Sequence, residues 1–298
     1  MNTPSILHAL TPLPHMSPFD VNMAYDAGFD AVTPYTGLTL DEVTAFTQDV
    51  IFSRAPENGR RTGIFIGGRD AGLAVDMLER ARAAMQPPFE VSVFADPSGA
   101  FTTAAAMVAV VEKHLKAGGR GGLAGQRVAV FGATGVVGGV AAVIAAQAGA
   151  AVTLVAHRAG SGLEEKAAEL RRRFGVETAV TGGGDDDAKV AVLRASDVAL
   201  CAARAGVQVL SAAVLAAAPE LAVVADVNAV PPAGAEGVSP FDDGTPVAGG
   251  RTAGVGALAV GNVKFMVQHH LLQRMLEADS RQYLSFGDAF AHARTLVA

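Results

Sequence analysis

The sequence has few of the residues on which several classes of protein depend. It contains no tryptophan and a single cysteine, Cys201, among 298 residues. One cysteine forms neither a disulfide framework nor a zinc cluster, and this usage fits the reducing cytoplasm. Lysine is also scarce, with five copies in the chain, and the formal net charge is −6. The sequence therefore lacks the basic footprint of a nucleic-acid-binding protein.

Charged residues of either sign are sparse: they make up 17% of the chain, whereas 50% of the residues are hydrophobic. This composition excludes a disordered chain and is sufficient for packed domains. The amino-terminal residues have neither the basic flank nor the apolar core of a signal peptide. The 22 uncharged residues of Gly135–Ala156 are long enough to cross a bilayer, but they are mostly glycine and alanine and end in a β-branched run. We expect a buried helix and a buried strand there, and no membrane contact.

Short apolar runs alternate with helical patterns along most of the chain, which is typical of parallel α/β proteins. In the first third, the expected strands are Ser5–Leu10, Ala31–Tyr35, Thr62–Gly67 and Glu90–Ala95. The expected helices there are Ser17–Ala27, Leu40–Phe52, Ala71–Met85 and Ser98 to about Lys116. A linker follows at Ala117–Gly125, where five of nine residues are glycine.

A second alternating series follows the linker. Its expected strands are Arg127–Phe131, Ala151–Ala156, Val176–Val180, Val198–Ala203 and Ala222–Val227. One expected helix follows the first of these strands and ends at Gly149, and the others are Gly162–Phe174, Asp186–Ala195 and Val209–Ala217. A Pro/Gly-rich segment, Pro231–Gly250, precedes two last helices, from Gly256 to about Glu277 and near Phe286–Leu296. We therefore expect two parallel α/β domains. Residues 1–117 plus about 256–298 form the first, and residues 124–250 form a Rossmann-type, doubly wound second domain.

The strongest motif is RVAVFGATGVVGGV, at Arg127–Val140, where a buried strand leads through glycines into an alanine-rich helix. Glycine is needed where the chain turns tightly and approaches a pyrophosphate, and the helix start offers free N–H groups to phosphate. The motif predicts a dinucleotide site, although a glycine-rich helix packed on a sheet has the same pattern. The residues expected at the cofactor are Gly132, Thr134, Gly135, Val136, Val137 and Gly138.

The end of the next strand bears on the choice of cofactor. An NAD-specific site usually has an acid there, whereas this sequence has His157 and Arg158. Arg158 suits a 2′-phosphate, which favours NADP or the use of both cofactors, unless it is an ordinary solvated charge. Asp226 and Asn228 end the fifth strand and are expected beside the nicotinamide. The seven histidines are not spaced as metal ligands, so no metal site is expected.

Ligands of open α/β sheets bind at the carboxyl ends of the strands, which directs attention to Asp96, Thr102 and Thr103 in the first domain. The two threonines are also compatible with an ordinary first helical turn. Asp20 is either a substrate ligand or the acid of a capping box begun by Ser17. Lys264 is the only formally charged residue between Arg251 and Arg274, so it either extends to water or belongs to a site.

Five segments together resemble the bacterial NAD(P)-dependent methylene-tetrahydromethanopterin dehydrogenases of one-carbon metabolism. They are His15–Phe29, Ile51–Gly68, Ala95–Met107, Ala225–Gly234 and Gly254–Phe265. The resemblance covers essentially the whole chain. It implies oxidation of 5,10-methylene-tetrahydromethanopterin to the methenyl compound with NAD(P)⁺, in a route that takes formaldehyde towards formate and CO₂. It also implies a homo-oligomer, an active-site cleft between the two domains, and a pterin site that contains Asp20, Thr102 and Lys264.

Two other functions stay open at this stage. A methylene-tetrahydrofolate dehydrogenase performs the same chemistry on the folate carrier. The bifunctional folate enzymes also hydrolyse the methenyl product with a Tyr/Lys pair early in the chain, and because the first lysine here is Lys113, no cyclohydrolase activity is expected. A non-catalytic NADP-sensing protein would bind the cofactor without turnover. The polar strand ends of the first domain favour an enzyme over a sensor.

Overall fold

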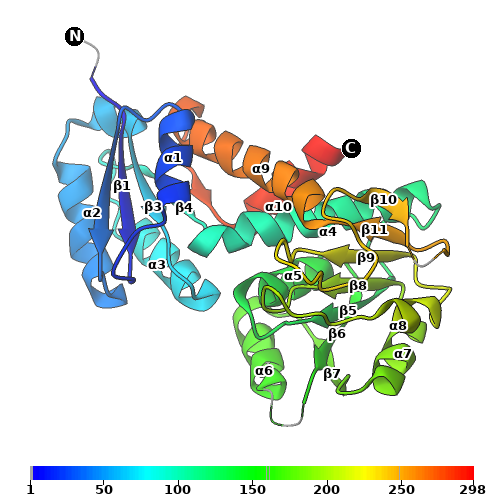
Figure 1. The fold of residues 1–298 in the computed structure, drawn as a ribbon. Helices are drawn as coiled ribbons and strands as arrows, with labels where there is room; N and C mark the ends of the chain where they lie inside the picture. Colours follow the sequence, from blue (N-terminus) through cyan, green and yellow to red (C-terminus); the bar gives the residue numbers. More distant parts are fainter. Residues whose placement is uncertain (1–2, 159, 161, 248) are drawn as a thin grey trace. The chain divides into compact units, whose positions relative to one another are not determined.

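The computed structural model describes residues 3–158, 160, 162–247 and 249–298. These residues form two α/β units, each built on its own sheet (Figure 1). The first unit consists of Met1–Thr102 and Phe265–Ala289, and the second of Thr103–Lys264 and Phe290–Ala298. The predicted fold class, two α/β domains with a Rossmann-type second sheet, is confirmed. The domain boundaries and the cleft expected from the sequence stay predictions.

The first sheet has the strand order β12-β4-β3-β1-β2, and each of its pairs is parallel. Its strands are β1 (Ile6–Thr11), β2 (Ala31–Thr36), β3 (Thr62–Ile66), β4 (Ser92–Ala95) and β12 (Tyr283–Leu284). The helices between them are α1 (Pro18–Asp26), α2 (Val43–Phe52) and α3 (Ala71–Ala83), with short 3₁₀ turns at Leu40–Glu42, Pro56–Arg61 and Pro97–Gly99. Strand β2 adds to one side of β1 and strand β3 to the other, so the order of the strands reverses between β1 and β3. Ligands of such sheets bind at the carboxyl ends of the strands at this switch point.

Strand β12 was not expected from the sequence. It lies near the carboxyl end of the chain and adds to the edge of β4, where Val93 N donates to Gln282 O at 2.7 Å. Gln282 N in turn donates to Ser92 Oγ at 3.1 Å. A strand of two residues is too short to show an alternating pattern, which is why sequence periodicity missed it.

The second sheet has the order β10-β11-β9-β8-β5-β6-β7. Its strands are β5 (Arg127–Phe131), β6 (Ala151–Ala156), β7 (Thr178–Gly182), β8 (Val198–Cys201), β9 (Val223–Asp226), β10 (Asp243–Pro246) and β11 (Ala253–Val255). The shorter helices of the unit are α5 (Val136–Gln147), α6 (Leu163–Phe174), α7 (Asp186–Arg194) and α8 (Ala212–Ala216). The six parallel strands have the order of a Rossmann fold, in which the third, second and first strands are followed by the fourth, fifth and sixth.

Each boundary between the two units falls inside a helix. These helices are α4 (Ala100–Ala117), α9 (Ala257–Glu277) and α10 (Phe286–Val297). Within the second unit, α10 is joined to α4 by an ion pair. Arg294 donates to both carboxylate oxygens of Glu112, at 2.6 and 2.9 Å. A bidentate pair with a carboxylate that is only 8% exposed fixes the orientation of both side chains.

The Pro/Gly-rich segment contains more order than the sequence suggested, since β10 lies within it. Strand β10 pairs antiparallel with β11, and β11 continues the parallel sheet beside β9. The sequence of β10 is Asp-Gly-Thr-Pro, which has little β propensity. Its first residue is held instead by side chains of α4, because Asp243 accepts from Lys113 Nζ and His114 Nε2, both at 2.6 Å. Such long-range contacts are invisible in a local pattern.

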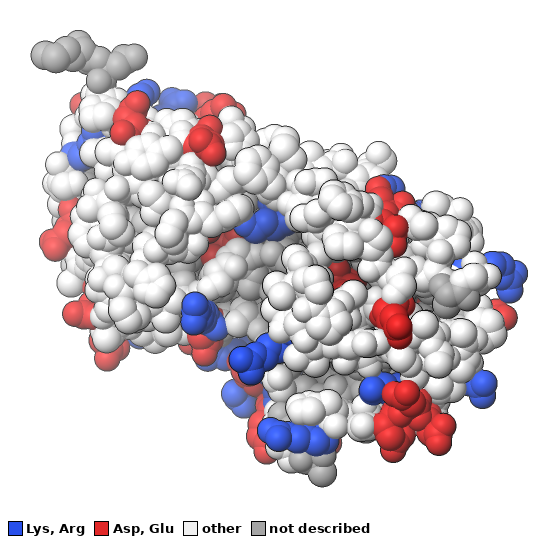
Figure 2. All heavy atoms as spheres, viewed as in Figure 1, with Lys and Arg blue, Asp and Glu red and all other residues white. Residues whose placement is uncertain are grey.

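Two surface properties bear on the expected surroundings of the protein. In the part of the chain that the structure describes, no helix is both long and apolar enough to span a bilayer. On the face drawn in Figure 2, acidic and basic side chains are interspersed among uncharged ones.

The first strand of the second sheet is held by one buried carboxylate, Asp197. It accepts from the backbone N, Nε and an Nη atom of Arg127 at 2.9 to 3.0 Å, and from Arg120 Nη1 at 2.8 Å. Arg120 lies in the glycine-rich linker and Arg127 begins β5, so the carboxylate joins both to the turn before β8. The Arg127 side chain, above all, lowers the pKa of Asp197 from 3.8 to about 2.

We expect Asp197→Asn to lower the free energy of unfolding by about 1 kcal/mol near neutral pH, since charged hydrogen bonds are lost at a partly solvated site. A depressed pKa stabilises the fold above the ordinary value of 3.8, and this contribution disappears as the pH falls towards 2. The difference between wild type and variant in urea unfolding should therefore shrink between about pH 4 and pH 2. A difference that stays constant over this range would contradict the assignment.

Candidate dinucleotide and substrate sites

The turn after β5 brings three backbone segments so close together that side chains are excluded. Gly132 has a φ of +86°, and a Cβ atom on it would lie 2.4 Å from the carbonyl oxygen of Ala202. A Cβ on Gly138 would lie 2.5 Å from Gly132 O. Gly135 caps α5, and its N–H donates to Gly132 O at 3.0 Å. These glycines let β5, α5 and the loop after β8 meet as a dinucleotide fold requires.

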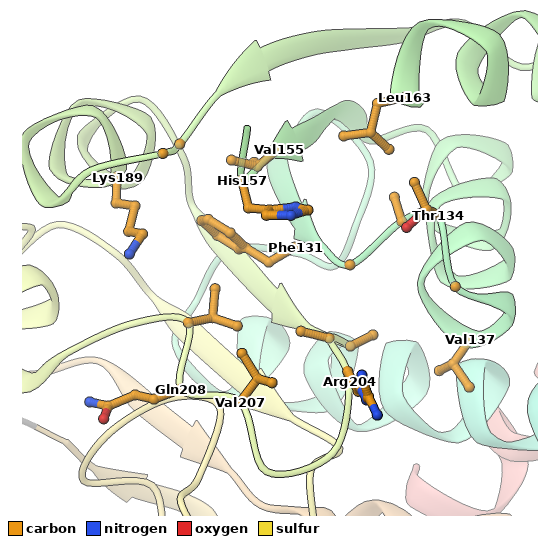
Figure 3. A pocket seen from close by; sticks show the side chains of 18 residues that line it. Phe131, Thr134, Val137, Val155, His157, Leu163, Lys189, Arg204, Val207 and Gln208 are labelled. Atoms are coloured by element: carbon orange, nitrogen blue, oxygen red, sulfur yellow. The ribbon is translucent and has the colours of Figure 1, made fainter. Parts of the chain in front are cut away.

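A cavity of about 770 Å³ opens beside this turn, within the second unit (Figure 3). Five of the predicted cofactor residues line it: Gly132, Thr134, Gly135, Val137 and His157. Val136, Gly138, Arg158, Asp226 and Asn228 are not among the lining residues. The cavity lies at the carboxyl ends of β5 and β8, which are neighbours in the sheet but not in the chain. This is the topological switch point at which open α/β sheets bind nucleotides.

The end of β6 has the two basic side chains predicted there, but in different places. His157 lines the main cavity, whereas Arg158 lines an adjoining cavity of about 560 Å³. Leu163 and Gly184 border both cavities, so the two spaces are neighbours. A Cβ on Gly184 would lie 3.2 Å from His157 O. No acid stands at this strand end, where an NAD-specific site usually has one.

Sequence reasoning missed several residues of the main cavity. Lys189 extends into it from α7, and Arg204 and Gln208 reach it from the loop after β8 (Figure 3). The signal for Arg204 was available, because it follows the fourth strand of a Rossmann sheet and such strand ends share one edge. Lys189 lies inside a helix and has no comparable signal in the sequence. It pairs with Asp186 Oδ1 at 3.3 Å.

Asp226 and Asn228 organise the loop after β9. Asp226 accepts from the backbone N–H groups of Asn228, Gly234 and Ala235 at 3.0, 2.7 and 3.2 Å. Burial raises the pKa of Asp226, and these three hydrogen bonds oppose the rise. Asn228 Oδ1 accepts from Gly206 N at 3.2 Å, in the loop that lines the cavity. Both side chains thus fix backbone near the cavity, and a contact with the nicotinamide stays a prediction.

In the first unit, Asp96 and Thr102 lie together at the start of α4, and both are fully buried. Asp96 Oδ1 accepts from the backbone N of Phe101 and Thr102, at 2.9 and 3.2 Å. Thr102 Oγ1 donates to Asp96 Oδ2 at 2.6 Å. These contacts match the structural alternative, in which the pair shapes a helical turn. Thr103, the next residue, is half-buried. Substrate binding by these three residues stays a prediction.

Asp20 is not the acid of a capping box, because Ser17 forms no side-chain cap hydrogen bond. Its carboxylate is buried and accepts from Gln268 Nε2 of α9 at 2.8 Å, within the first unit. Helix α1 follows β1, one of the two strands at the switch point of the first sheet. Lys264 lies near the start of α9 and is half-buried. Substrate binding by Asp20 and by Lys264 stays a prediction.

The doubly wound sheet, the glycine turn and the cavity beside it define a dinucleotide-binding protein of the two-domain α/β class. The fold is similar to that of shikimate 5-dehydrogenase from Listeria monocytogenes, solved in complex with shikimate and NAD. The TM-score is 0.53 at 12% sequence identity, over 99% of this chain and 96% of that chain. At this identity the likeness concerns the fold alone.

Closer relatives identify the family. Residues 18–98 match the family model described as methylene-tetrahydromethanopterin dehydrogenase, N-terminal. The NAD(P)-dependent methylenetetrahydromethanopterin dehydrogenase of Methylorubrum extorquens is 51% identical over 286 residues, 96% of each chain. The bifunctional protein MdtA of the same organism is 31% identical over 262 residues, 88% of each chain. The chain belongs to the family of NAD(P)-dependent methylenetetrahydromethanopterin dehydrogenases, and the resemblance inferred from its motifs is confirmed.

We expect Gly132→Ala to weaken NADH binding at least about tenfold. The new methyl group would push the loop after β8 away, and alanine is strained at the positive φ of this position. Fluorescence titration with NADH measures the effect. Gly287→Ala, in α10, is the matched control, since a Cβ there meets no atom within 4 Å and the residue lines neither cavity. Equal affinities of the two variants would contradict the role given to the turn.

Proposed function

We propose that this chain transfers a hydride from 5,10-methylene-tetrahydromethanopterin to NAD(P)⁺ and so forms methenyl-tetrahydromethanopterin. The observation that carries the proposal is the 51% identity with a dehydrogenase of this name over 96% of both chains. The cavity at the glycine turn supports it, because about 770 Å³ is a suitable size for a nucleotide ligand. The corresponding process is one-carbon metabolism, in the oxidation of formaldehyde. We place the protein in the cytoplasm as a homo-oligomer.

The reaction needs little acid–base chemistry from the protein. The hydride leaves the methylene carbon between N5 and N10, and the nitrogen lone pairs stabilise the resulting cation as an amidinium. When bound, NAD(P)⁺ supplies the hydride acceptor, nicotinamide C4. No substrate proton has to move, so the protein's task is to hold the donor and acceptor carbons at roughly 3 to 3.5 Å. Neither a general base nor a metal is required.

The residues of the second unit fit the dinucleotide. The glycine turn allows backbone to approach the pyrophosphate, and the first N–H groups of α5, from Val136 to Gly138, are available for its oxygens. His157 borders the space for the adenosine ribose, with Arg158 beside it for a 2′-phosphate. No acid directly follows β6, so the strand end itself suits NADP as well as NAD, while Glu164 and Glu165 line the same adjoining cavity as Arg158.

The pterin site is proposed to contain Asp20 and Lys264, with the turn at Asp96, Thr102 and Thr103. Gln268 fixes the Asp20 carboxylate in one orientation, which suits a hydrogen bond with the donor groups of the pterin ring. Lys264 is proposed to bind a ring oxygen. An ammonium next to the amidinium that forms would be repelled, so it should point away from the reacting carbon.

A spectrophotometric assay with methylene-tetrahydromethanopterin and each cofactor in turn tests the proposed reaction. We expect the absorbance of reduced nicotinamide to appear with both NAD⁺ and NADP⁺. Methylene-tetrahydrofolate, assayed in parallel, should be the poorer substrate. Faster turnover of the folate would reassign the carrier, and binding of NADPH without turnover of either pterin would make the protein a cofactor sensor.

Lys264→Met should lower kcat/KM for the pterin about 10- to 100-fold, because a charged hydrogen bond to the substrate is lost. The affinity for NADH should not change, since the role assigned to Lys264 is on the pterin. Lys166→Met is the control, because that lysine pairs with Glu169 on α6 and does not line the main cavity. Wild-type kcat and KM in the Lys264 variant would remove the residue from the site.

A further inference from the structure

Arg204 is a basic residue of the dinucleotide cavity that neither the motif nor the family resemblance singled out. It lies in the loop after β8 and lines the cavity together with Thr134 and Val137. In Figure 3, Arg204 lies on the side of the cavity near Val137 of α5, and Lys189 lies on the opposite side. The cavity therefore has a cationic side chain on each of two opposite sides.

Backbone contacts place Arg204 next to the glycine turn. A Cβ on Gly132 would lie 2.4 Å from Ala202 O and 2.6 Å from Ala203 N, so these two residues are packed directly against the turn. Arg204 is the next residue along the chain. Asn228 holds the same loop from the other side, because Gly206 N donates to its Oδ1 at 3.2 Å. The position of Arg204 is thus fixed by its neighbours on both sides.

The charge of Arg204 is not compensated by the protein. The guanidinium is exposed, and it forms no hydrogen bond or ion pair with any other residue that the structure describes. None of the described residues that line the cavity is an aspartate or a glutamate. Lys189, by contrast, pairs with Asp186. An arginine without a carboxylate partner, in a cavity without acids, is suited to an anionic group of the ligand.

We propose that Arg204 binds the pyrophosphate of NAD(P), together with the N–H groups at the start of α5. The proposal rests on the function given above, in that it requires NAD(P) to occupy this cavity. The pyrophosphate carries two negative charges, and a helix amino terminus provides only about half a positive charge. A guanidinium adds a full charge and two parallel donors for phosphate oxygens. The second anion, the 2′-phosphate of NADP, belongs at the end of β6, on a different strand.

This assignment predicts a loss that both cofactors share. Arg204→Met should weaken binding of NADH and of NADPH by the same factor, about 10- to 100-fold, as expected for a charged hydrogen bond. ADP-ribose, which keeps the pyrophosphate and lacks nicotinamide, should lose the same factor. Arg204→Lys should recover part of the affinity, because the charge is kept while the bidentate geometry is lost.

Calorimetric titration of the purified full chain with the three ligands measures these effects without any pterin. Arg251→Met is the matched control: this arginine belongs to the same unit, pairs with Glu220 and is not among the cavity residues. Arg158→Met is the comparator and should weaken NADPH alone. Melting curves report whether each variant folds. If Arg204→Met does not fold, the affinities of Arg204→Lys are compared with those of the wild type instead.

Three results would overturn the proposal. They are unchanged affinity of Arg204→Met for NADH and NADPH, a loss confined to NADPH, and a loss for NADH that ADP-ribose does not share. The first removes Arg204 from the site, the second moves it to the 2′-phosphate, and the third moves it to the nicotinamide. Because no substrate is present, these outcomes are independent of whether the wild type oxidises methylene-tetrahydromethanopterin. Failure of that reaction in the assay would leave the binding result readable.

Discussion

The close contact between the turn after β5 and the loop after β8 is the constraint on which the dinucleotide site depends. With 2.4 Å between a hypothetical Cβ of Gly132 and the Ala202 oxygen, only glycine allows the two segments to meet. The contact joins the start of α5 to the residues that follow β8, at the edge of the sheet where the carboxyl ends of β5 and β8 lie. Residues of both segments line one cavity, so a single backbone approach determines which side chains face a bound nucleotide.

Three of the buried acids hold backbone groups in place. Asp96, Asp197 and Asp226 each accept hydrogen bonds from main-chain N–H groups of a turn or strand start. Such carboxylates satisfy buried donors that would otherwise be left without partners. This use of acids is consistent with a hydride transfer in which no substrate proton moves. The protein positions two ligands, and rigid loops achieve this better than mobile ones.

Much of the second unit could be predicted from the sequence, because its strands are continuous apolar runs and its glycines follow a known pattern. Strands β5 and β6 begin and end at the predicted residues, and five of the residues expected at the cofactor line the cavity. Strands β10, β11 and β12 were not predicted, since each has four residues or fewer. Strands β10 and β12 are also held by distant partners, His114 and Ser92. Lys189 was missed for a similar reason, because its place in the cavity depends on how α7 packs.

The site residues of the first unit show a different limit of sequence reasoning. Asp20 could be read from the pattern of α1 either as a cap or as a ligand, and the partner that distinguishes these readings, Gln268, is more than 200 residues away. Asp96 and Thr102 were found as neighbours at a strand end, but their mutual hydrogen bond depends on the turn at Ser98, whose φ is +53°. Residue types indicate which chemistry is available, and only tertiary contacts decide how it is used.

The position of β12 has a consequence for the order of events during synthesis. This strand completes the edge of the first sheet, yet it leaves the ribosome after all seven strands of the second sheet. The nascent amino-terminal half must therefore wait with the edge of β4 uncovered while a complete Rossmann sheet is being made. Exposed strand edges are prone to pair with other chains. Until β12 is made, the growing chain is therefore exposed to pairing of β4 with other nascent chains.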